Sequence, residues 1–253
     1  METKKVQRIK LIIAICVIMV TVALILFRYI KYQKEGEKNM PFNLSQIIII
    51  STAEKDEIAN IEQSENTLLG NFNIIQNNDI YISIKKNDQN AKNNETIKNI
   101  TIENIEIVET PKTGKLNAYM PNSTDKKKYI YSDQYLVSQS LTYRGAEENN
   151  YKTLQISANG GDIGISFANK EVGQYISGDD TEVTYNGKML SKLGLTNEDV
   201  KSKIAFDLII ELSDQKKYLG RINLDLSCNQ LVEEGKSQTQ ITDFSNVIFK
   251  RTQ

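Results

Sequence analysis

Histidine is absent from the 253 residues of the chain, and its absence excludes several kinds of active site. A Ser-His-Asp triad, a Cys-His nucleophile pair and the usual zinc sites all need an imidazole ring. An enzyme built from this chain would have to rely on other groups, such as carboxylates.

Cysteine is scarce and tryptophan is missing. Cys16 lies in the apolar N-terminal run and Cys228 is alone in the rest of the chain. We therefore expect no internal disulfide and a fold stabilised by its hydrophobic core. Without tryptophan the chain lacks a common platform for stacking sugars. Six tyrosines offer a substitute, although side chains at strand spacing are more often core or strand-edge residues; they are Tyr119, Tyr129, Tyr131, Tyr135, Tyr143 and Tyr151.

The chain also has no large excess of charge of either sign, because it contains 31 Lys and Arg residues and 32 Asp and Glu residues. Seven of the basic residues and only one of the acidic residues lie within residues 1–34, which leaves the remainder acidic. Nucleic-acid binding needs a basic footprint. We therefore expect no nucleic-acid partner.

One long apolar run is present, the 17 uncharged residues Leu11 to Phe27. As a helix it spans roughly 25 Å, and Tyr29 and Ile30 extend it toward the ~30 Å of a hydrocarbon core. Its basic flanks and all-round apolar surface argue against a buried core helix. Apolar residues continue past a possible cleavage site at Ala23, and Cys16 lacks the small preceding residue of a lipoprotein. The run predicts an uncleaved anchor.

The anchor divides the chain into four parts. We predict a cytoplasmic tail at residues 1–10, a transmembrane signal anchor at 11–30, a stem at 31–43 and an extracytoplasmic β domain at 44–253. Basic residues flank both ends of the span almost equally, so the short N-terminal tail and the large C-terminal domain favour an N-terminus inside and a domain outside. Abundant Ile, Asn and Lys, whose codons are AT-rich, suggest a low-GC bacterium and hence its cell membrane.

Strand patterns dominate after the stem. The clearest is a pair of runs in which every second residue is apolar, residues 204–212 and 218–226, joined by a turn at 213–217. Weaker runs occupy residues 46–52, 79–85, 100–108 and 154–167. Strand signals at short intervals predict a mainly β fold, an antiparallel β-sandwich or jelly-roll-like domain.

Several positions predict local irregularities. A change of phase within residues 100–108 predicts a bulge near Asn104. A hairpin is expected at 159–162, because Gly160 and Gly161 tolerate positive φ. Gly36, followed by Pro41, should end the N-terminal helix.

One short helical insertion is expected within the β domain. Residues 187–195 could form one or two turns capped by Gly194. Thr196 with Asp199 has the pattern of an N-cap for a further turn through Lys201.

Two tripeptides and a tetrapeptide spell signatures of serine penicillin-binding enzymes: Lys112-Thr113-Gly114, Ser123-Thr124-Asp125-Lys126 and Ser132-Asp133-Gln134. Their order is inverted, their spacing is too tight, and the third ends in Gln where Asn is expected. Ser123 also lies in Pro-Asn-Ser-Thr-Asp, which favours a loop. We interpret this region as a short strand at 115–120 between turns.

The remaining candidates are weak. Ser191-Lys192 and Ser202-Lys203 are adjacent in sequence, which does not bring the two groups together as a dyad requires. Asp179, Asp180 and Glu182 form an acidic loop of a kind that calcium binds, but without EF-hand spacing. Gly160-Gly161 lacks the lysine and helix of a phosphate-binding loop. We therefore assign no catalytic, cofactor-binding or metal-binding residue.

Three functions fit these observations. The first is a non-enzymatic, single-pass membrane-anchored β domain that binds or scaffolds a protein or glycan partner at the cell envelope. The second is an envelope enzyme that acts on glycan or peptide through two carboxylates. The third is an accessory subunit of a membrane complex, although the span has no G-x-x-x-G packing motif.

Overall fold

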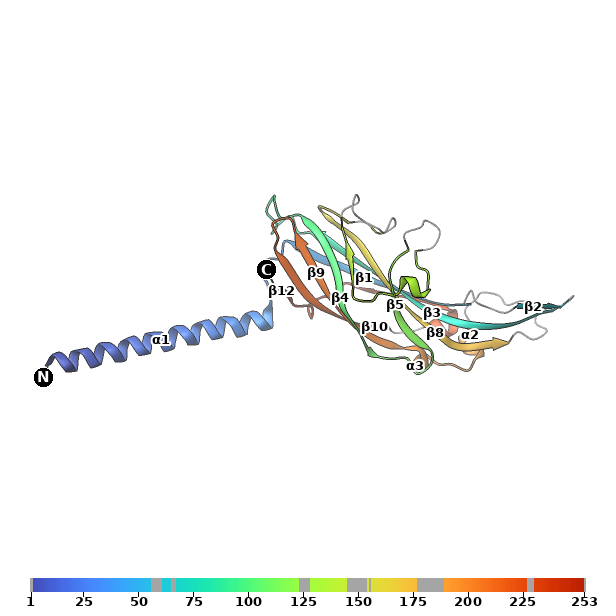
Figure 1. Ribbon diagram of the computed structural model, residues 1–253, viewed down its shortest axis with the longest axis horizontal. Coiled ribbons are helices and arrows are strands. Elements are labelled where there is room, and N and C mark those ends of the chain that lie inside the picture. Colours follow the sequence, from blue (N-terminus) through green and yellow to red (C-terminus); the bar gives the residue numbers. More distant parts are fainter. Residues whose placement is uncertain are drawn as a thin grey trace.

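The computed structural model describes residues 2–55, 61–64, 67–122, 128–144, 154, 156–176, 189–226 and 230–252. It consists of one long helix and a β domain that extends away from the helix end (Figure 1). Helix α1 (Glu2–Glu35) is long and apolar enough to cross a membrane over Lys10–Glu35. Its apolar side chains do not pack on the domain; Leu24 is 59% exposed and Phe27 is 65% exposed. The N-terminal helix therefore has the length and apolar surface of a membrane span, which supports the predicted anchor.

The β domain consists of two antiparallel sheets, which confirms the predicted mainly β, sandwich-like fold. One sheet has the order β11-β1-β3-β8-β5, with β2 added to β3 and β7 to β8; the other has the order β12-β10-β9-β4-β6. The first sheet contains β1 (Phe42–Lys55), β2 (Ile61–Ser64), β3 (Thr67–Lys86), β5 (Lys115–Tyr119), β7 (Ile156–Ser157), β8 (Gly160–Ile176) and β11 (Lys236–Ile241). The second contains β4 (Ile97–Glu109), β6 (Ser140–Tyr143), β9 (Ser202–Leu212), β10 (Lys217–Leu226) and β12 (Phe249–Arg251).

The main core lies between the two sheets. The predicted alternation is confirmed, because the apolar residues of β9 and β10 point inward and are buried. They meet a row of isoleucines from β1, β3 and β8 that includes Ile49, Ile80 and Ile165. The first sheet is longer than the second, and the β2–β3 hairpin lies at the end of the molecule opposite α1 (Figure 1).

The predicted bulge in β4 is also confirmed. The pairing of β4 with β9 shifts between Glu103 and Glu106, and Asn104 has a φ of 49°. Arg221 stabilises the bulge, since its Nη1 donates a hydrogen bond of 2.8 Å to the carbonyl oxygen of Asn104. Because of the bulge, the isoleucines of β4 before and after Asn104 all pack against the core between the two sheets.

The β domain contains more short helices than the single helical insertion that was predicted. The expected insertion forms two short helices, α2 (Met189–Lys192) and α3 (Asn197–Val200). Thr196 is the N-cap of α3, as predicted, and forms a capping box with Asp199. Two further helical turns, the 3₁₀ helix η1 (Asp133–Tyr135) and α4 (Leu231–Glu234), were not expected. Helices α2 and α4 cover a second apolar cluster on the longer sheet. Helices of three or four residues are too short for a helical period to show in the sequence.

The stem is fixed to the last strand of the second sheet. Helix α1 ends before Gly36, as predicted, and Gly36 has a φ of 68°. The backbone N–H of Glu37 then donates to the carbonyl oxygen of Phe249 at 2.7 Å, and the N–H of Arg251 donates to the hydroxyl of Tyr32 at 2.8 Å. These contacts cover the outer edge of β12. An uncovered edge strand would expose unpaired backbone groups that can pair with another chain and cause aggregation.

The β domain begins slightly earlier than the predicted residue 44. Strand β1 starts at Phe42, which is fully buried. Its ring packs edge-on against the rings of Tyr218 and Phe249, with centroids 5.3 Å and 5.2 Å away. The predicted stem at 31–43 is thus shared between the end of α1, a short connection and the first residues of the sheet.

Candidate functional site

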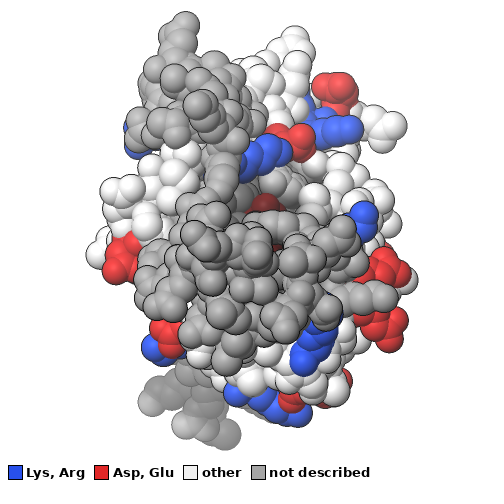
Figure 2. Space-filling view, turned by 90° about the vertical axis from the view of Figure 1, so that its right-hand side faces the viewer, with Lys and Arg blue, Asp and Glu red and all other residues white. Residues whose placement is uncertain are grey.

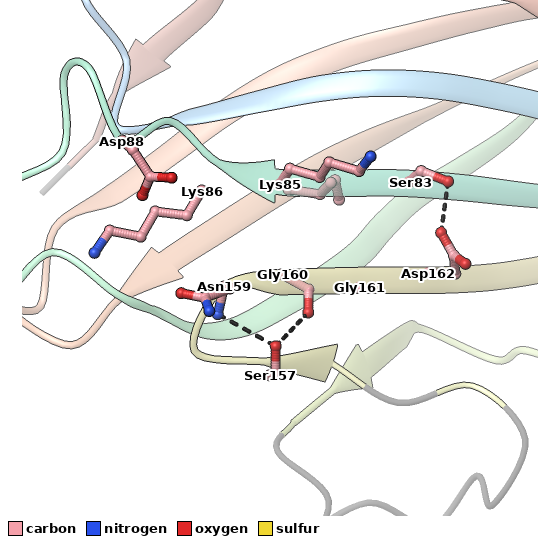
Figure 3. A pocket seen from close by; sticks show the side chains of 10 residues that line it. Ser83, Lys85, Lys86, Asp88, Ser157, Asn159, Gly160, Gly161 and Asp162 are labelled. Carbon is pink, nitrogen blue, oxygen red and sulfur yellow. Dashed lines mark hydrogen bonds between the residues drawn. The ribbon is translucent and has the colours of Figure 1, made fainter.

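A groove of about 500 Å³ lies at one end of the longer sheet (Figure 3). The end of β3 forms one wall and the β7–β8 hairpin forms the other. Its lining is mostly polar: Ser83, Ile84, Lys85, Lys86, Asp88, Ser157, Asn159, Gly160, Gly161 and Asp162. The groove is close to the stem, because the N–H of Asn87 donates to the carbonyl oxygen of Pro41 at 2.8 Å.

The hairpin wall is built by one glycine with positive φ. Gly160 has a φ of 100°, and a Cβ atom there would collide with the carbonyl group of Ile84. The predicted hairpin is therefore confirmed, although Gly160 alone takes the positive φ that we allowed for both glycines. The N–H of Lys86 donates to the carbonyl oxygen of Asn159 at 2.9 Å, which fixes the two walls together.

The chemistry of the groove favours binding over covalent catalysis. Ser83 donates its hydroxyl proton to Oδ1 of Asp162 at 2.5 Å. A lone carboxylate is far less basic than a serine alkoxide, so this contact does not by itself activate the hydroxyl as a nucleophile. Lys85 is exposed to water, whereas a lysine acting as a base or nucleophile needs to be desolvated.

The two acids of the groove do not face each other. Figure 3 shows Asp88 with Lys86 at one end and Asp162 with Ser83 at the other, and the carboxylate of Asp162 points to Ser83. Glycoside hydrolysis needs two carboxylates that flank one bond. The arrangement instead offers separate cationic and anionic groups that could hold a polar ligand.

A second cluster of polar residues surrounds Asp79 on β3. The hydroxyl of Ser166 donates to Oδ1 of Asp79 at 2.6 Å and the hydroxyl of Tyr131 donates at 3.2 Å. Burial raises the pKa of Asp79, and these two hydrogen bonds oppose the rise. Burial likewise raises the pKa of Tyr131. The cluster fastens the segment after β5 onto the sheet.

The tyrosines expected to be core or edge residues have that role where they are described. Tyr119, Tyr129 and Tyr143 are buried, and Tyr131 and Tyr135 are half-buried. The ring of Tyr119 packs edge-on against the ring of Tyr131 at 5.3 Å. Rings buried in this way cannot stack on a sugar. Tyr151 lies in a segment that the structure does not describe.

Lys112-Thr113-Gly114 is a structural turn. The N–H of Lys112 donates to the carbonyl oxygen of Asp199 at 2.9 Å, and Nδ2 of Asn169 donates to the carbonyl oxygen of Thr113 at 2.9 Å. Gly114 has a φ of 86°, and a Cβ atom there would collide with Asn169. The strand predicted at 115–120 follows as β5. Ser123 to Lys126 belong to residues without a described placement.

Ser202 and Lys203 do not form a dyad. Ser202 is buried at the start of β9, whereas Lys203 is exposed and forms an ion pair of 3.3 Å with Glu109. Successive residues of a strand point to opposite faces. Ser191 and Lys192 are both exposed on α2.

The described part of the chain contains no group of three or more His, Cys, Asp or Glu residues that could hold a metal ion. The calcium candidates Asp179, Asp180 and Glu182 lie beyond the described residues, as does Cys228. The calcium hypothesis therefore stays a prediction.

Comparison of the chain with protein-family models, with curated proteins and with solved structures found no match. The function must therefore be inferred from the anchor, the groove and the contacts between them.

The groove itself was missed by sequence reasoning. Both of its walls were predicted, one as a strand at 79–85 and the other as a hairpin at 159–162. Their adjacency depends on the pairing of β3 with β8, which joins segments far apart in the chain. Abundant polar residues at both turns were the only available signal.

Proposed function

We propose that the chain is a single-pass membrane-anchored protein of the bacterial cell envelope whose β domain binds or scaffolds a partner without catalysing a reaction. In this proposal the N-terminus is cytoplasmic and the domain lies outside. The observation that carries it is the direct attachment of the anchor to the sandwich. Glu37 and Tyr32 hydrogen-bond to β12, and seven residues after the helix end the chain is already in the buried core at Phe42.

This attachment supports a binding or scaffolding role. A domain on a long flexible tether can reach many positions, whereas a domain bonded to its membrane helix is presented at one height and in one orientation. The groove is held in the same way, because Nδ2 of Asn87 donates to the carbonyl oxygen of Met40 at 3.2 Å. A partner in the envelope would meet the groove at a set distance from the membrane.

The distribution of charge supports a partner other than nucleic acid. On the end of the molecule that faces the viewer in Figure 2, basic and acidic side chains alternate among the described residues and form no broad basic area. Many lysines are neutralised locally, as in the ion pairs of Lys98 with Glu211 and of Lys115 with Glu171. A protein or glycan partner suits this surface better than a phosphate backbone.

Two other functions are alternatives to this binding role. A carboxylate enzyme of the envelope would use acids of the groove, and an accessory subunit would use the helix α1 as its contact with other membrane proteins. Asp88 and Asp162 lie at opposite ends of the groove in Figure 3, which does not favour the enzyme alternative over a binding role.

Site-specific photo-crosslinking in native membranes tests the proposal. A photoreactive residue replacing Lys86 in the groove should give an adduct of one defined mass. The same residue replacing Lys236, an exposed position on β11 that does not line this groove, is the matched control and should give none.

Two results would contradict the binding role. Equal adducts from both positions would show that the groove is not the contact. Turnover of a glycan or peptide by the purified full chain, abolished by Asp88→Asn together with Asp162→Asn, would establish the enzyme alternative instead.

A further inference from the structure

One apolar side chain of the β domain is exposed beside the anchor. Outside α1, the large apolar residues that are exposed in the described part of the chain are Val108, at 55%, and Ile248, at 37%. Val108 is near the end of β4, away from the anchor. Ile248 precedes β12, and its Cγ2 lies 2.6 Å from the point that a Cβ atom of Gly36 would occupy. Ile248 therefore packs directly on the end of the anchor helix.

The length of the helix sets the height of this contact above the membrane. The apolar span ends at Ile30, and Gly36 follows six residues later. At 1.5 Å per residue this is about 9 Å along the axis, and less when the helix is tilted. The headgroup layer of one leaflet is about 5–8 Å thick. Gly36, and with it Ile248, is therefore at the outer margin of the headgroups.

Tyrosines at the end of the span give a second measure of the same height. Tyrosine is enriched at the membrane–water interface, and Tyr29 and Tyr32 occupy this part of α1. The hydroxyl of Tyr32 accepts the hydrogen bond from the backbone N–H of Arg251. Strand β12 is thus one hydrogen bond away from a residue expected in the interface.

The charges beside Ile248 suit the phosphates of a lipid surface. Lys34 and Arg251 are exposed, and neither forms an ion pair with a residue that the structure describes. Their neighbours Lys31 and Lys38, in contrast, are paired with Glu35. Lys34 lies two residues before Gly36, which Ile248 contacts, and Arg251 lies three residues after Ile248. Both cations therefore belong to the segments that meet at this end of the domain.

We propose that this end of the sandwich rests on the bilayer. The bilayer-facing surface consists of Ile248, Lys34 and Arg251; Ile248 enters the interface, and the two cations pair with phosphates of anionic phospholipids. The proposal rests on the membrane span of the proposed function. It adds a second membrane contact, made by the β domain itself.

The contact fixes how the domain stands. Figure 1 shows α1 and the sandwich extended along the same direction, with the β2–β3 hairpin at the far end. A domain seated on the bilayer at Ile248 stands upright and holds that hairpin away from the membrane. The domain is then fixed at two points and cannot swing about Gly36.

The absence of tryptophan allows a direct test. The full chain carrying Ile248→Trp is reconstituted into vesicles of phosphatidylcholine and phosphatidylglycerol, and its fluorescence is compared with that of the Val108→Trp chain. We expect a blue-shifted emission for Ile248→Trp and quenching by lipids brominated near the headgroup that is severalfold stronger than for Val108→Trp.

Two controls keep the outcomes distinct. Asn246→Trp places the probe at an exposed position of the same loop, so it decides the result if Ile248→Trp does not fold. Alkaline extraction of the vesicles reports the span separately. A chain that resists extraction but shows equal quenching at both loop and β4 positions overturns the bilayer contact and leaves the anchor intact. A chain that is extracted overturns both.

Discussion

Replacing Gly36 with alanine tests the attachment of the anchor to the sandwich. Gly36 has a φ of 68°, and an added Cβ atom would lie 2.5 Å from the carbonyl oxygen of Phe249. A matched control exists in Gly194, which has a φ of 71° and no atom within 4 Å of an added Cβ. The two substitutions impose the same backbone strain and differ in the collision alone.

The magnitude follows from these contacts. A left-handed conformation costs a residue with a Cβ atom about 1–2 kcal/mol, and both variants bear this cost. In Gly36→Ala the stem must also move away from β12 and lose the hydrogen bonds of Glu37 and Tyr32. Two such bonds contribute about 1–3 kcal/mol together. For a domain of this size, this extra loss lowers the melting temperature by roughly 2–12 °C.

The assay is thermal unfolding of the full chain in detergent, followed by the circular dichroism of the sheets and by the near-ultraviolet signal of tyrosine. Gly36→Ala should melt below Gly194→Ala by the stated margin. Equal melting temperatures of the two variants would refute the attachment and remove the main support for the proposed function.

Three further outcomes are expected from the same measurement. Phe42→Ala removes a fully buried ring and should cost about 3–5 kcal/mol, and a chain that begins at residue 44 should be destabilised for the same reason. The ion pair with Lys216 lowers the pKa of Glu95, so the stabilisation it provides is lost as the pH falls below the ordinary carboxyl pKa of about 4.3. Glu95→Gln should therefore lose less stability on acidification than the unmodified chain. An equal loss of stability in acid for both chains would contradict this. Asp79 has the opposite sign, because burial raises its pKa; stability should fall as the pH rises above about 3.9 toward that raised pKa. Asp79→Asn should abolish this fall, and a persisting fall would show that another group causes it.

Local chemistry made much of the fold predictable. Alternation in β9 and β10 gave both strands and their turn, the phase change located the bulge at Asn104, and Gly36 ended the helix at the expected residue. Each of these depends on residues close together in the chain. The sequence therefore carries the information in a short window.

Other elements depend on distant partners and could not be predicted. Strand β3 extends well before the predicted residue 79, through Gln76 to Asn78, which are polar and yet buried. Asn78 is satisfied across the sheet: Ser51 donates its hydroxyl proton to Oδ1 of Asn78 at 2.7 Å, and Nδ2 of Asn78 donates to the carbonyl oxygen of Phe167 at 3.2 Å. Strand β12 has three residues and exists through its pairing with β10 and the stem. Such elements leave no periodic pattern in the sequence.

The same distinction explains why the candidate site emerges only from the structure. The groove, the stem and the bilayer-facing surface come from four separate segments, and they gather at one end of the domain because Asn87 bonds to Met40 and Pro41 while Arg251 bonds to Tyr32. A ligand that tightened the loop after β3 would act on residues 40 and 41, which connect the anchor to β1. Occupancy of the groove and seating of the domain on the membrane therefore share one short segment of backbone, and a change at either should be measurable at the other.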